Sequence, residues 1–242
     1  MHSENRWGRW LVVVFYAVAM AWVESAVVLY LRTLVNRLDP YQPHPLPLAD
    51  GLGGAELIRE IATLIMLATV GWLAGRTWRS RVAYAVLAFG VWDIAYYLFL
   101  RPLTDWPRSL LDWDILFLLP LPWWGPVIAP ASIALLMLLG GSLVVFGDRV
   151  ERPFWPGRTT LALSFTGGLL ALYAFMAGSL RVAGQGEQAL REFLPTEFNW
   201  PLFLVAWALM ATPVIELAVE WVRRRQSETL DESATKLAST ST

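Results

Sequence analysis

The chain has 242 residues, of which 56% are hydrophobic and only 16% are charged, and its formal net charge is −1. Soluble domains average about 25% charged residues, so the composition is that of a membrane protein, and the near-neutral charge predicts no nucleic-acid partner. Cys is absent and His occurs only as His2 and His44, outside every apolar run, so we expect no metal, no haem or other cofactor, and no Cys- or His-dependent catalysis.

Six apolar runs are each long enough to cross about 30 Å of hydrocarbon as a helix. They cover residues 10–34, 56–74, 81–100, 126–146, 160–180 and 200–221. The sequence therefore predicts an all-α fold, a polytopic transmembrane helical bundle that forms a single domain over residues 1–225. Residues 226–242 are rich in Ser, Thr and Glu, which predicts a disordered cytoplasmic tail.

The distribution of Lys and Arg predicts the orientation of the bundle. If the N-terminus is cytoplasmic, twelve of the 19 Lys and Arg residues fall in cytoplasmic segments. The positive-inside rule then favours both termini in the cytoplasm. A cleaved signal peptide is a competing interpretation of the first run, with Arg6 and Arg9 as its basic region, but the run continues without a break to Leu34.

Acidic residues inside the apolar runs are the strongest functional indication. Glu24 and Asp93 each lie in the middle of a run, where a carboxylate costs at least about 2–3 kcal/mol unless a charge, a cavity or a ligand offsets it. Counted from the cytoplasmic ends at about 1.5 Å per residue, they lie roughly 20 Å and 18 Å deep. Glu60 lies about one turn below the outer surface, so all three acids fall in the outer half of the membrane.

Potential partners for these acids lie nearby in the sequence. Tyr96 and Tyr97 share the helix face of Asp93, and three arginines lie at similar or shallower depth, namely Arg32, Arg59 and Arg101. We therefore predict a buried polar site in the outer half of the bilayer. The alternative interpretation is a set of structural contacts that hold the helices together.

The loop over residues 101–125 is predicted to contain a short interfacial or re-entrant helix. Ser109 and Asp112 have the spacing of a capping box, which would start a helix that runs to about residue 119. Asp112 and Asp114 would then lie over the buried site. Four Trp residues gather in this loop, which is also typical of a simple aromatic anchor at the headgroup level.

Three segments resemble an uncharacterised bacterial family of multi-pass inner-membrane proteins. They are residues 21–32 (AWVESAVVLYLR), 90–97 (GVWDIAYY) and 122–130 (PWWGPVIAP). The resemblance covers roughly the first 150 residues. It implies a bacterial inner-membrane protein, and it implies no activity and no catalytic or ligand residue.

Three functions remain open at this point. The first is a protein that binds or moves a proton, a cation or a small solute through the acidic site. The second is a membrane enzyme that acts on a lipid or polyprenyl substrate, which is less favoured because the sequence has no P-loop and no GxSxG motif. The third is a non-catalytic subunit of a larger complex, whose partners would be other membrane subunits as well as the lipid bilayer.

Overall fold

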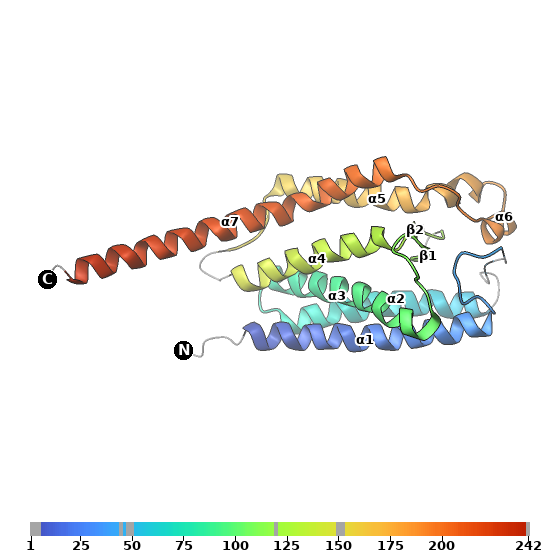
Figure 1. Cartoon of the computed structure of the whole chain (residues 1–242), viewed down its shortest axis with the longest axis horizontal. Coiled ribbons are helices and arrows are strands. Elements are labelled where there is room, and N and C mark those ends of the chain that lie inside the picture. Colours follow the sequence, from blue (N-terminus) through green and yellow to red (C-terminus); the bar gives the residue numbers. More distant parts are fainter. Residues whose placement is uncertain (1–5, 44–45, 47–50, 119–120, 149–152, 241–242) are drawn as a thin grey trace.

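The computed structural model describes residues 6–43, 46, 51–118, 121–148 and 153–240; His2 and His44 lie outside them. The described residues form helices and two short strands (Figure 1). In chain order these are α1 (Arg6–Leu34), α2 (Gly51–Ala74), α3 (Trp78–Thr104), β1 (Trp113–Ile115), β2 (Trp124–Pro126), α4 (Ile128–Gly147), α5 (Arg158–Ala183), α6 (Glu187–Glu192) and α7 (Trp200–Thr240). Six of the helices are long and apolar enough to cross a membrane, which confirms the predicted polytopic helical bundle.

The bundle is organised around α3, which packs against α1, α2 and α4. Helices α5 and α7 form a second unit, which packs onto α4 mainly through α7 (Figure 1). The short hairpin of β1 and β2 lies beside α4 and α5, at the end of the bundle opposite the two termini.

Glycines allow the central helices to approach closely. A Cβ atom on Gly90 of α3 would lie 2.5 Å from the carbonyl oxygen of Ala134 in α4, and one on Gly167 of α5 would lie 2.5 Å from the carbonyl oxygen of Ala206 in α7. No side chain fits at such distances. Helix pairs in a membrane gain packing contacts in this way, because lipid provides no hydrophobic drive for helices to associate.

The loop between α3 and α4 differs from its prediction. The Ser109–Asp112 motif forms in part: the Asp112 carboxylate accepts hydrogen bonds from the backbone N–H groups of Arg108 and Ser109 at 2.7 and 3.2 Å, but the Ser109 hydroxyl accepts from the N–H of Leu111. It closes a single turn, however, and the described residues that follow form strand β1, which pairs antiparallel with β2. Pro122, which has no N–H to donate, disfavours continuing a helix through this loop. The predicted short helix is therefore supported only for this one turn.

Helix α7 is longer than its predicted span, which ends at residue 221. It continues as a helix to Thr240 and projects beyond the other helices (Figure 1). The physical reason is that a helix already formed extends at the gain of one hydrogen bond per residue. Residues 226–240 contain neither Gly nor Pro to end it.

Candidate functional site

A cavity of about 330 Å³ lies between α1, α2, α3, α4 and the hairpin. It begins beside the chain that follows α1, at Val35 and Pro40, and ends near Asp93 and Phe89 in the middle of α3. Asp93 is eleven residues from the end of α3 at Thr104, or roughly 17 Å along the helix axis. The cavity therefore reaches well into the interior of the bundle.

Acidic groups outnumber basic groups in the lining of this cavity. Most of its surface is apolar, but it includes five carboxylates (Glu24, Glu56, Glu60, Asp93, Asp114) and three guanidinium groups (Arg32, Arg37, Arg59). The pairing of these groups decides which of them are available to a ligand.

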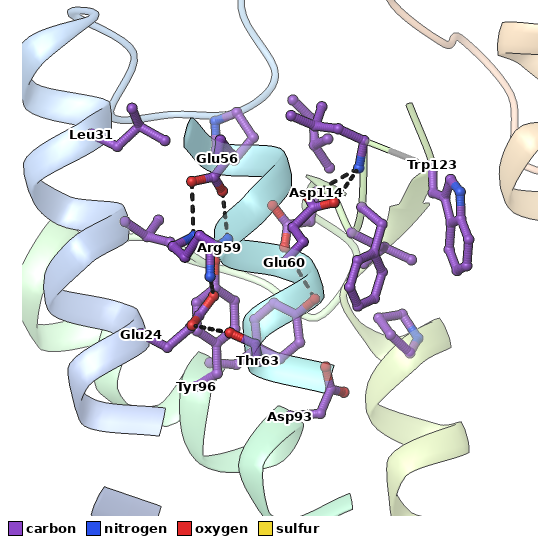
Figure 2. Close-up of a pocket in the computed structure, with 18 of the residues that line it drawn as sticks. Glu24, Leu31, Glu56, Arg59, Glu60, Thr63, Asp93, Tyr96, Asp114 and Trp123 are labelled. Carbon is purple, nitrogen blue, oxygen red and sulfur yellow. Dashed lines mark hydrogen bonds and ion pairs between the residues drawn. The ribbon is translucent and has the colours of Figure 1, made fainter. Parts of the chain in front are cut away.

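Arg59 of α2 lies at the centre of one ion-pair cluster (Figure 2). It pairs with Glu24 of α1 and, one turn away on its own helix, with Glu56, whose Oε2 is 2.8 Å from Arg59 Nε. Thr63, one turn further along α2, donates a hydrogen bond to Glu24 Oε2 at 3.3 Å. Two carboxylates are therefore matched by one guanidinium group and one hydroxyl, and the cluster ties α1 to α2.

Asp114 of β1 forms the second cluster. It pairs with Arg32 of α1 at 3.2 Å and accepts a hydrogen bond from the Tyr97 hydroxyl of α3 at 3.1 Å. Arg32 also lies over the ring of Trp106, 4.5 Å from its centroid. Burial raises the pKa of Asp114 to about 6, although Arg32 and the Tyr97 hydroxyl both favour its ionised form. This cluster joins the hairpin to α1 and α3.

Two carboxylates of the cavity form no direct ion pair among the described residues, although Arg59 acts on Glu60 electrostatically from a longer distance. Both oxygens of Glu60 accept from the backbone N–H of Leu118, at 3.1 and 3.3 Å. Asp93 differs from every other acid in the site, because its buried Oδ2 has no hydrogen-bond partner within the described chain. Figure 2 shows Asp93 at the opposite end of the site from Glu56. The unmatched negative charge thus lies at Glu60 and at the deep end of the cavity.

The structure brings most of the predicted site residues together and leaves two apart. Eight of them line the cavity, namely Glu24, Glu60, Asp93, Tyr96, Tyr97, Arg32, Arg59 and Asp114. Arg101 instead lies at the exposed end of α3, where it donates to the carbonyl oxygen of Pro107 at 2.8 Å and pairs with Asp105. Asp112 belongs to the turn described above and does not reach the cavity.

Three further polar residues of the cavity were absent from the predicted set, namely Glu56, Thr63 and Arg37. Helical spacing could have found the first two, since Glu56 lies three residues before Arg59 and Thr63 four residues after it. Arg37 follows α1 and is buried against its own loop, where it donates to the carbonyl oxygens of Pro40 and Gln42. No sequence signal indicates such a fold of the loop.

Comparison of the chain with protein-family models, with curated proteins and with solved structures gave no match. Among the described residues, no cluster of three His, Cys, Asp or Glu side chains could hold a metal ion. The fold and the cavity define a polytopic helical membrane protein, and its function has to be argued from the chemistry of the cavity.

Proposed function

We propose that this protein binds a small cationic solute or a proton in the acidic cavity, or moves it across the membrane. The observation that carries the proposal is the buried Oδ2 of Asp93, which has no hydrogen-bond partner within the described chain, in a cavity whose acids outnumber its arginines. A buried carboxylate oxygen without a partner is costly, and the cost is greatest at membrane depth. A bound cation or proton at Asp93 would offset that cost.

The ion pairs around the cavity favour a cation over an anion. Arg59 and Arg32 are already engaged by Glu24, Glu56 and Asp114. An entering anion would have to compete with these carboxylates for the arginines. A cation would instead meet Asp93, whose buried Oδ2 has no partner among the described residues, and Glu60, which forms no direct ion pair there.

The same pairing speaks against a role as a subunit whose charges await another chain. Both arginine clusters close within this chain, from α1 to α2 and from α1 to the hairpin. Both hydroxyl–carboxylate pairs in the cavity are held by arginines: Tyr97 with Asp114 by Arg32, and Thr63 with Glu24 by Arg59. Neither pair is therefore free to activate a lipid substrate.

We propose further that the protein resides in a bacterial inner membrane with both termini in the cytoplasm. The excess of Lys and Arg on the side of the termini supports this orientation, and the resemblance of residues 21–32, 90–97 and 122–130 supports the membrane. In that orientation the cavity opens toward the outer side.

Radiolabelled methylammonium and a pH-sensitive dye inside liposomes test this function on the reconstituted protein. We expect methylammonium binding or flux, or proton flux, above that of empty liposomes. Asp93→Asn should reduce the signal at least tenfold, since the amide cannot neutralise a cation. Asp105→Asn is the matched control, because this carboxylate lies at the exposed end of α3, with 78% of its side chain accessible. An Asp93→Asn signal equal to that of the wild type would contradict the proposal.

A further inference from the structure

A second cavity, of about 230 Å³, lies in the other half of the bundle, between α3, α4, α5 and α7. Its walls are apolar except for Ser164, and include Val86 of α3, Leu161 of α5 and Leu217 of α7. Walls of this kind favour hydrocarbon over water. We call it the apolar groove.

The apolar groove adjoins the acidic cavity. Ile133 and Met137 of α4 line both of them. The lining residues of α4 continue in one stripe at helical spacing, from Pro130 in the acidic cavity to Val144 in the groove. From Ile133 to Val144 the stripe is roughly 17 Å long. Gly140 lies within it, and its lack of a side chain leaves room beside Val214.

We infer that the ligand is a single-chain alkyl amine, whose ammonium head binds at Asp93 while its hydrocarbon chain passes Ile133 and Met137 into the apolar groove. The inference rests on the proposed function, since it gives the cation of the acidic cavity a chemical class. The negative charge of the acidic cavity assigns the ammonium head to it, and the continuous apolar stripe of α4 assigns the hydrocarbon chain to the groove.

A primary ammonium suits the Asp93 carboxylate better than an anionic head does. It supplies three N–H donors and one positive charge, and hydrogen bonds between ionised partners are the strong ones. Asp93 offers a buried oxygen that has no partner within the described chain. A carboxylate or sulfate head would instead be repelled by it.

Photolabelling tests this assignment on the full-length protein in lipid nanodiscs. The probe is dodecylamine with a diazirine at the far end of its chain, and labelled peptides are identified by mass spectrometry. We expect the label on residues of the groove, such as Leu161 and Leu217, and at least tenfold less of it in Asp93→Asn. Excess dodecylamine should remove the label, whereas excess dodecanoate should not.

A variant at the junction between the cavities separates the head from the chain. Met137→Trp should remove the label from the groove and leave Asp93-dependent binding of radiolabelled butylamine intact. Leu139→Trp is the matched control, because Leu139 lies on the exposed side of the same helix and lines neither cavity. It should keep both signals.

The outcomes separate the inference from the proposed function. If butylamine binds through Asp93 but the diazirine labels only lipid-facing residues such as Leu204, the alkyl chain lies in the bilayer and the inference is overturned while the proposed function stands. The inference is likewise overturned, and the proposed function stands, if the groove is labelled as strongly in Asp93→Asn as in the wild type. The groove would then accept an alkyl chain without any contribution from Asp93. If neither amine, methylammonium nor a proton gives an Asp93-dependent signal, both proposals fail.

Discussion

Replacing Arg59 with Met should destabilise the protein more than any other single change in the acidic cavity. Met replaces the guanidinium with an apolar side chain of similar length, and it leaves Glu24 and Glu56 without a cation. The side chains of these two acids are only 10% and 14% exposed. Removing one partner of a buried ion pair costs about 3–5 kcal/mol. Because the Arg59 side chain is itself 22% exposed, we expect the lower end, about 3 kcal/mol.

The assay is unfolding by sodium dodecyl sulfate in mixed micelles, followed by helical circular dichroism and by Trp fluorescence. Glu24→Gln, introduced on its own and together with Arg59→Met, completes a double-mutant cycle. The double variant should be more stable than the sum of the single changes by about 1–2 kcal/mol, since it removes one of the stranded charges. Arg108→Met is the control: Arg108 lies 69% exposed, and a change there should stay within about 0.5 kcal/mol. A cost below about 1 kcal/mol for Arg59→Met, or strict additivity in the cycle, would refute the reasoning.

Two further predictions concern the hairpin and the helix packing. Burial raises the pKa of Asp114 from 3.8 to about 6. Between these two pH values the folded protein therefore keeps a proton on Asp114 that the unfolded chain has already released. The stability of the wild type relative to Asp114→Asn should therefore fall by up to about 3 kcal/mol as the pH rises from 4 through 6, and a difference independent of pH in detergent unfolding would contradict this. Gly90→Ala should cost about 1–3 kcal/mol, because the new Cβ would lie 2.5 Å from the carbonyl oxygen of Ala134. Gly168→Ala, where a Cβ meets nothing within 4 Å, should be neutral or stabilising by up to about 1 kcal/mol, and equal effects of the two substitutions on the unfolding free energy would exclude a steric cause.

The sequence predicted the helices well because their signal is local. An apolar run of about 20 residues in lipid must satisfy its backbone hydrogen bonds internally, and a helix does so. The bounds of each apolar run therefore approximate the bounds of a helix. The acids were found for the same reason, since a carboxylate within such a run is conspicuous whatever the tertiary structure. Counting residues along the helices was enough to place Glu24, Glu60 and Asp93 at compatible depths.

The features that were missed depend on tertiary contacts. Arg101 and Asp112 have depths compatible with the site, but depth does not indicate which way a side chain points. Arg101 faces the carbonyl oxygens after α3, and Asp112 satisfies the N–H groups of its own turn. The pairing of β1 with β2 joins residues on either side of a Pro-containing turn. Nothing in the local pattern distinguishes that pairing from a short helix.

Whether Asp93 is a ligand-binding group or a structural one can be decided by stability alone. Elsewhere in the cavity, the ion pairs of Arg59 and Arg32 hold α1 to α2 and to the hairpin. Asp93 contributes no such contact through its buried Oδ2. A group retained for binding at the expense of folding should stabilise the protein when it is neutralised. We therefore expect Asp93→Asn to raise the unfolding free energy of the ligand-free protein by about 1–2 kcal/mol at pH 8, while it abolishes amine binding. A structural clamp would show the opposite sign, a loss of stability like that of Arg59→Met.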